Sequence, residues 1–180
     1  MTKRVPFKRR RLQLTNYKKR LKLIISRKPR FVVRISNKYI TCQFIKYKSD
    51  GDVTLVTFNS RALNNYGFKG GKNLQSAYLS GLAAGLVALE KGVKNAVLDI
   101  GLRSSVKNSR VYACLKGILD SGIKIPHGEE ILPSDELLKK DKIMKIIDEV
   151  KKNPRKKVKK PASKSKKVSN AKKPKEVSKK

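Results

Sequence analysis

The chain has 180 residues and a formal net charge of +33, from 46 Lys and Arg against 13 Asp and Glu. The charge is segregated: residues 1–49 carry 17 bases and no acid, residues 50–150 carry 14 bases and 12 acids, and residues 151–180 carry 15 bases and one acid. Self-repulsion of this size destabilises a compact monomer unless a polyanion neutralises it, which favours a nucleic-acid-binding protein, while the lack of any apolar run near 18 residues excludes a membrane helix.

The first 29 residues are expected to form a basic, RNA-binding arm and helix. Residues 8–11 are four consecutive bases, which cannot pack against a neutral surface. Thr15 or Asn16 can cap a helix over residues 17–25. The apolar face of this helix is predicted to comprise Tyr17, Leu21, Ile24 and Ile25.

After Pro29 the hydrophobic period changes from 3.6 to 2, which indicates strands. Residues 30–35, 39–47 and 53–58 are predicted to form a three-stranded antiparallel meander, with a hairpin turn before the third strand. Alternation along these segments places one set of side chains inward. The expected inward residues are Phe31, Ile40, Cys42, Phe44 and Phe58.

The middle of the chain is predicted to be mainly helical. Residues 60–66 favour a short helix and residues 67–73 a glycine-rich loop, and a long helix is expected over residues 74–91. Gly81 and Gly85 are small residues spaced by four, and they predict that this helix lies close on the sheet.

The second half continues with a buried strand over residues 95–100 and a loop over residues 101–109. A helix is expected over residues 110–121, followed by an extended piece over residues 123–126. After Pro133 the pattern predicts an amphipathic helix to about residue 152. Its apolar stripe is expected to contain Ile143, Ile146, Ile147 and Val150.

The element order β-β-β-α-β-α predicts an α/β fold, a single small sandwich with a mixed sheet. Four parts are expected: the arm and helix at residues 1–29, a globular core at 30–133, a C-terminal helix at 134–152 and a disordered Lys-rich tail at 153–180. The tail consists mainly of Lys, Pro, Ala, Ser, Val and Asn and has no aromatic residue, so it cannot form a core.

The two cysteines, Cys42 and Cys114, lie far apart within apolar patterns. This favours buried free thiols in a reducing compartment over a disulfide. No apolar segment of a secretory signal follows the first basic residues, so a cytosolic location is expected. The basic blocks are interrupted by Pro and lack a wide apolar face, so no membrane partner is expected.

Catalysis is poorly supported. His127 is the single histidine, without a second His or paired Cys at metal-ligand spacing, and is expected at the surface. Asp99 is expected to form a structural ion pair with Arg103. The glycine-rich loop differs from a nucleotide-binding P-loop because Tyr66 and Asn73 replace the required Gly and Ser or Thr. We expect no enzyme activity, cofactor, metal or small-molecule substrate.

Basic residues interleaved with aromatics in the first half favour RNA, because aromatic rings stack on unpaired bases and Arg binds phosphate. The glycine-rich loop suits close approach to an RNA backbone through free N–H groups. The loop 103–110 has three bases, three serines and no acid, and it either contacts RNA or is a solvent-exposed loop with no binding role. The predicted RNA-binding residues are Lys3, Arg4, Phe7, Lys8, Arg9, Arg10, Arg11, Asn16, Tyr17, Lys18, Lys19, Arg20, Lys22, Arg27, Lys28, Arg30, Arg34, Lys38, Tyr39, Phe68, Lys69, Lys72, Arg103, Ser104, Lys107 and Arg110.

Several short blocks in chain order carry a family resemblance. They are residues 4–11 (RVPFKRRR), 15–20 (TNYKKR), 28–34 (KPRFVVR), 67–70 (GFKG), 76–81 (SAYLSG), 98–102 (LDIGL) and 115–117 (LKG). Together they resemble ribosomal protein eighteen of the large subunit, in its archaeal and eukaryotic branch. The resemblance covers about residues 3–133, and no single block would suffice.

The resemblance implies binding of 5S rRNA and its docking onto the large-subunit rRNA at the central protuberance, in the cytoplasmic ribosome, beside neighbouring large-subunit ribosomal proteins. The chain departs from the family at residues 104–105, which are serines where prolines are common, and in its Lys-rich tail. The implied RNA-contacting regions are residues 3–11, 17–22, 30–39, 67–72 and 103–110.

A sequence-nonspecific nucleic-acid-packaging protein is the alternative. Residues 153–180 alone resemble the tail of a chromatin protein. Such a packager has no need of a folded core with patterned loops, whereas a ribosomal protein uses the shape of that core.

Overall fold

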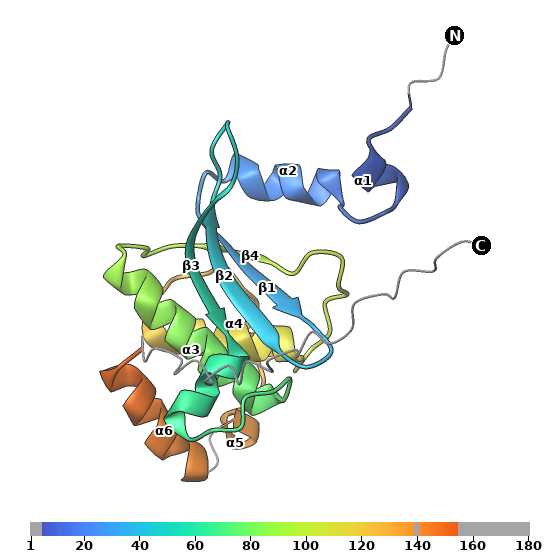
Figure 1. The fold of residues 1–180 in the computed structure, drawn as a ribbon. Coiled ribbons are helices and arrows are strands. Elements are labelled where there is room, and N and C mark those ends of the chain that lie inside the picture. Colours follow the sequence, from blue (N-terminus) through green and yellow to red (C-terminus); the bar gives the residue numbers. More distant parts are fainter. Residues whose placement is uncertain (1–4, 139–140, 155–180) are drawn as a thin grey trace, which may run out of the picture.

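A four-stranded mixed sheet forms the centre of the computed structural model, which describes residues 5–138 and 141–154. The strands are β1 (Arg30–Ile35), β2 (Ile40–Lys46), β3 (Val53–Asn59) and β4 (Val97–Asp99), in the order β3-β2-β1-β4. The first three form an antiparallel meander, and β4 pairs parallel with β1. The predicted α/β class, the mixed sheet and the element order are confirmed (Figure 1).

The two faces of the sheet differ in polarity. The inner face is apolar and buried, with Phe31, Val33, Cys42, Phe44 and Phe58 all less than one tenth exposed. On the outer face, Asn59 donates to the Thr41 hydroxyl at 3.0 Å and Gln43 to the Thr57 hydroxyl at 3.2 Å. One packed face and one polar face are typical of an antiparallel sheet, and they explain the alternation along β2.

The helices α3 (Leu74–Glu90) and α4 (Arg110–Ser121) pack against each other over the inner face (Figure 1). A Cβ added to Gly81 would overlap the backbone of Cys114, and one added to Gly117 would overlap the carbonyl of Tyr78. The predicted close packing at Gly81 is present, but its partner is α4 and not the sheet. The periodicity of one helix cannot show which element faces its small residues.

The N-terminal part contains a single turn, α1 (Lys8–Arg11), and the helix α2 (Tyr17–Ile25), whose bounds match the prediction. The Asn16 side chain caps α2 by accepting from the backbone N–H of Lys19 at 3.1 Å. The predicted apolar face is largely uncovered, since Leu21 is 60% exposed and Ile25 is 68% exposed. In Figure 1, α2 stands off the sheet, beside the turn that joins β2 and β3.

The remaining helical segments are η1 (Ser60–Tyr66), η2 (Glu129–Ile131), α5 (Asp135–Leu138) and α6 (Asp141–Lys152). The single C-terminal helix that we predicted is thus described as two helices, with residues 139–140 outside the described part. Helix α6 packs on α3, and its residues Ile147 and Val150 are buried, while the side chain of Ile143 is not described. No described helix combines the length and apolar character needed to cross a membrane.

The predicted tail begins inside the described part, because the Tyr66 hydroxyl donates to the backbone carbonyl of Asn153 at 2.6 Å. Residues 155–180 lie outside the described residues, and the division into four parts stays a prediction. Cys42 and Cys114 are free and fully buried, as expected. Burial and the neighbouring Cys42 raise the pKa of the Cys114 thiol, so the thiol stays protonated.

Candidate nucleic-acid interface

A groove of about 800 Å³ separates α1 and α2 from strands β1 and β4. Its walls carry many cations and one carboxylate, that of Asp99. We call this feature the basic groove. Its basic residues are Arg9, Lys19, Arg20, Lys22, Arg30, Arg34 and Arg103.

Helix α2 turns its polar side to the basic groove. Asn16, Lys19, Arg20 and Leu23 line it, at the spacing of one helical face. Leu21 and Ile25 lie on the other side of the helix and are exposed. This arrangement is the reverse of an ordinary surface helix, which buries its apolar face.

Two carboxylates hold the arginines of the groove in place. Asp52, beside the β2–β3 turn, accepts from Arg20 of α2 at 2.8 Å and from Arg30 of β1 at 2.7 Å. Asp99, in β4, accepts from Arg30 at 3.1 Å and from Arg34 at 3.3 Å. We call this chain of three arginines and two aspartates the arginine ladder, and it ties α2 to the sheet.

Arg30 occupies a different place from the one expected. Its residue is only 5% exposed, and both of its terminal nitrogens bind aspartates, so its guanidinium group is not presented to a ligand. The expected pairing of Asp99 with Arg103 is contradicted, because Asp99 pairs with Arg30 and Arg34. Arg103 instead donates to the carbonyl of Ile35 at 2.9 Å and lines the groove.

The arm beside the groove presents cations and an aromatic pair. All four bases of α1 are exposed, as are Lys18, Arg27, Lys28 and Lys38. The rings of Phe7 and Tyr17 lie 6.5 Å apart, and Phe7 is 75% exposed. Tyr39 is half-buried at the end of the β1–β2 turn. Lys3 and Arg4 lie outside the described residues.

In the glycine-rich loop, the backbone N–H groups of Gly70 and Gly71 are not free to bind phosphate. The backbone N–H of Gly70 donates to the Asn64 side chain at 2.8 Å, and that of Gly71 to the Ser76 hydroxyl at 3.2 Å. Phe68 is half-buried against the core. Lys69 and Lys72 remain exposed, so the loop offers side-chain cations but not a backbone cradle.

The loop 103–110 spreads its bases apart. Lys107 pairs with Glu130 at 3.1 Å, but both side chains are more than two thirds exposed, so this pair is weak and exchangeable. Arg110 contacts the carbonyl of Lys72 at 3.4 Å, which brings it next to the glycine-rich loop. Ser104 is exposed. Only Arg103 of this loop belongs to the basic groove.

Comparison with known proteins decides the family. The model of the family described as ribosomal large subunit proteins 60S L5 and 50S L18 matches residues 2–94 and 86–128. The chain belongs to this family. It is 51% identical over 150 residues to large ribosomal subunit protein uL18 of Aeropyrum pernix, covering 82% of this chain and 70% of that protein.

Two further uL18 proteins agree with this assignment. That of Korarchaeum cryptofilum is 47% identical over 148 residues, covering 82% of this chain and 76% of the relative. That of Methanothrix thermoacetophila is 49% identical over 137 residues, covering 76% and 81%. The chain is therefore a structural protein of the large ribosomal subunit in the cytoplasmic ribosome, and not an enzyme.

The role of Asp52 in this uL18 family member was not predicted from its sequence. The available signal was charge: Asp50 and Asp52 are the first acids after 49 residues that contain none. A carboxylate in such a setting could form an ion pair with any of many cations, and only the pairing of the strands shows which cations lie close to it.

Proposed function

We propose that the chain binds 5S rRNA through the basic groove and the arm, and helps to attach that RNA to the large-subunit rRNA at the central protuberance. Neighbouring ribosomal proteins are its further partners. The basic groove carries this proposal, since seven basic side chains line one groove with a volume of about 800 Å³.

The chemistry of the groove suits folded RNA. Arg34 and Arg103 are held at the groove by contacts with Asp99 and the Ile35 carbonyl, and a guanidinium group so held binds phosphate with defined geometry. Lys19 and Lys22 add exposed point charges from the facing helix. Phe7 offers an exposed ring for an unpaired base. In this proposal Arg30 supports the contact surface from inside, and the other predicted RNA-binding residues contribute direct contacts.

Competition binding tests the proposal. The full chain is bound to labelled 5S rRNA, and excess tRNA or duplex DNA is added. We expect both competitors to displace 5S rRNA far less well than unlabelled 5S rRNA does. Equal displacement by all three would reject recognition of 5S rRNA and favour the nonspecific packaging protein.

A matched pair of variants assigns recognition to the groove. Lys19→Ala/Lys22→Ala removes two groove cations, and Lys151→Ala/Lys152→Ala removes two exposed cations at the end of α6. Each phosphate contact that is lost lowers the slope of log K against log salt by about 0.7 to 0.9. We expect the groove variant alone to lose preference for 5S rRNA over tRNA. An equal loss in both variants would show that only total charge matters.

Deletion of residues 155–180 is a second test, and it keeps the described contact at Asn153 intact. We expect weaker overall affinity with unchanged preference for 5S rRNA, because the shaped surface remains. Loss of that preference would move recognition to the tail.

A further inference from the structure

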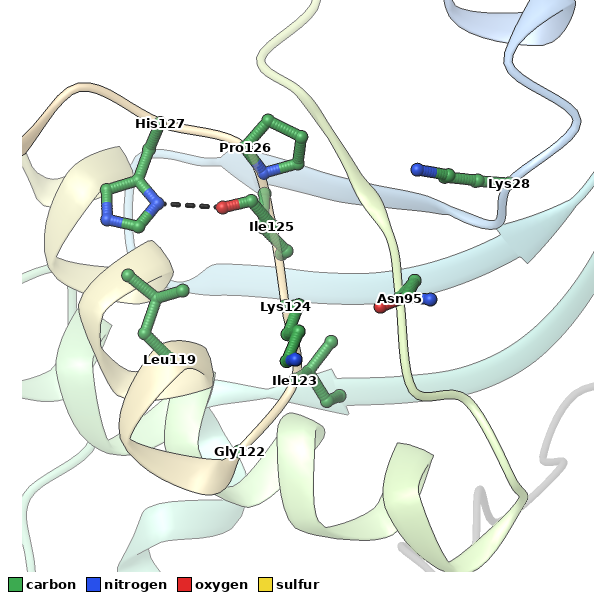
Figure 2. A pocket seen from close by; sticks show the side chains of 9 residues that line it. All are labelled: Lys28, Asn95, Leu119, Gly122, Ile123, Lys124, Ile125, Pro126 and His127. Carbon is green, nitrogen blue, oxygen red and sulfur yellow. Dashed lines mark hydrogen bonds between the residues drawn. The ribbon is translucent and has the colours of Figure 1, made fainter.

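A second hollow, of about 570 Å³, lies at the other end of the β1–β4 pair and shares no lining residue with the basic groove. We call it the Asn95 pocket. Lys28 precedes β1, Asn95 precedes β4, and the rest of the lining follows α4 along residues 122–127, with Leu119 from the helix itself (Figure 2).

The floor of the Asn95 pocket is apolar and firmly held. Ile123 and Ile125 are 1% and 4% exposed, so they anchor this segment in the core. The backbone of Lys124 forms a parallel bridge with Asn95, in which its carbonyl accepts from Ala96 at 3.1 Å. Leu119 and Pro126 complete the apolar part of the wall. The pocket is therefore built on fixed backbone.

The ring of His127 is also fixed. Its Nδ1 lies 2.7 Å from the carbonyl oxygen of Ile125, and because a carbonyl only accepts, Nδ1 carries the hydrogen. His127 is exposed, so its ring is accessible to a ligand. Figure 2 shows the ring on the same side of the pocket as Leu119, with Lys28 and Asn95 across from it.

Three polar side chains of the pocket have no partner within the described part of the chain. Within the described part of the chain, the side chains of Lys28, Asn95 and Lys124 make no hydrogen bond or ion pair, and no carboxylate lines the pocket. Two cations, one amide and an apolar floor disfavour a metal ion or a basic peptide. They match a ligand with a flat apolar body, a hydrogen-bonding edge and a negative charge.

We infer that the Asn95 pocket binds one unpaired nucleotide of RNA. The base packs against Leu119, Pro126 and the ring of His127, the Asn95 amide bonds to the base edge, and Lys28 and Lys124 bind the phosphate. A volume of about 570 Å³ is within the range of small-ligand pockets, about 300–1,000 Å³. Stacking with edge contacts is how proteins read unpaired bases. The inference requires an RNA partner, as the proposed function does, but not that the RNA is 5S rRNA.

Nucleotide titration tests the inference on the full, isotope-labelled chain. AMP, GMP, CMP and UMP are added separately, with inorganic phosphate and ribose 5-phosphate as controls, and amide NMR shifts are followed. We expect shifts at the amides of residues 122–125, His127 and Asn95, with nucleotides binding at least about fivefold more tightly than phosphate because the base adds stacking. Equal binding of phosphate, or shifts confined to the basic groove, would overturn it.

Matched variants sharpen this test. Lys124→Ala is expected to weaken nucleotide binding about fivefold, and Asn95→Ala to change the order of preference among the four bases. Lys94→Ala, an exposed neighbour outside the pocket, is the control and is expected to bind as the wild type does. Equal effects of Lys94→Ala and Lys124→Ala would reduce the result to general charge and overturn the inference.

The two proposals fail separately. If selective 5S rRNA binding persists while no nucleotide shifts the pocket, the Asn95 pocket is wrong and the proposed function stands. If nucleotides bind the pocket but 5S rRNA is not preferred, the proposed function is wrong and the inference about the Asn95 pocket stands. A peptide rich in Asp, Glu and aromatic residues that binds the pocket and excludes nucleotides would assign it to a protein partner and overturn the inference.

Discussion

The layer of α3 and α4 and the region around α2 are both attached to the same sheet, yet their contacts are of opposite kinds. Between α3 and α4, glycines bring two backbones together over a mainly apolar core. Helix α2 buries none of its residues and is joined to the sheet by the shared carboxylate of Asp52. The first region depends on shape and the second on charge.

This difference separates stability from binding. Apolar burial supplies most folding free energy, so the helix layer holds the fold. In the arginine ladder, the partly exposed pairs Arg20–Asp52 and Arg34–Asp99 add little stability but fix the direction of charged groups, and among its arginines only Arg30 is buried. Changes in the helix layer should therefore affect unfolding first, whereas changes in the arginine ladder should affect RNA selectivity first.

Gly81→Ala should have the largest effect on the helix layer. The new methyl group overlaps the backbone of Cys114, so we expect a loss of about 3 kcal/mol in the free energy of unfolding, measured by urea titration. Gly71→Ala is the control, since a Cβ there meets no atom within 4 Å, and its effect should stay within about 0.5 kcal/mol. A loss of stability in Gly81→Ala as small as that in Gly71→Ala would show that α3 and α4 can move apart without cost.

Asp52→Asn should have the second largest effect, and it separates the effect of net charge from the effect of arginine positioning. The change removes a carboxylate that two arginines share, so we expect about 1–2 kcal/mol lower stability and weaker, less selective binding of 5S rRNA. Electrostatics alone predicts the opposite, because the variant gains one positive charge. Asp50→Asn makes the same charge change in the exposed turn and should bind as tightly as the wild type or slightly more tightly. Tighter binding by both variants would refute the positioning role of Asp52.

Tyr78→Phe should cost about 1 kcal/mol, because the Tyr78 hydroxyl donates to Asp120 at 2.7 Å and so links α3 to α4. Burial, and then the bond to Asp120, raise the pKa of the Tyr78 hydroxyl. The folded state therefore keeps this proton above pH of about 10, where the unfolded state releases it, and wild-type stability falls there. Unfolding measured at pH 7 and pH 11 should show the gap between wild type and variant shrinking. A constant gap would contradict this pairing.

The smallest effect should come from salt on the attachment of α2. Between 0.1 M and 1 M salt, the amides of α2 should exchange faster, with a free energy of protection lower by about 0.5 kcal/mol. The reason is that Arg20 and Asp52 are 39% and 26% exposed, so salt screens the attraction between them. Amides of α3 should be unaffected or better protected. Equal acceleration in both helices would mean that α2 and α3 open together, so that charge would not be what distinguishes the attachment of α2.

Local structure was largely readable from the sequence. The bounds of α2, β1 and α4 follow from caps and hydrophobic periods within each segment, and these signals are local. The apolar face of α2 was recognised, but its exposure was not, because a pattern shows which residues share a face and not whether anything covers it. What covers a face depends on tertiary contacts.

The interface was harder to predict for the same reason. Asp99 was assigned to Arg103, four residues away, but the parallel pairing of β1 with β4 brings Arg30 and Arg34 to it across 69 and 65 positions. The basic residues were found by composition. Their division into Arg30, buried as a support, and Lys19 and Lys22, exposed on the groove, needed the fold.

The arginine ladder also has a consequence for how strongly a polyanion is bound. A free arginine side chain loses conformational entropy when it is immobilised, about 0.5–1.5 kcal/mol for each such residue. Arg20 and Arg34, which line the basic groove, are already held by Asp52 and Asp99. The folding of the protein has thus borne that loss before any phosphate arrives, so more of the attraction between the charges is retained as affinity.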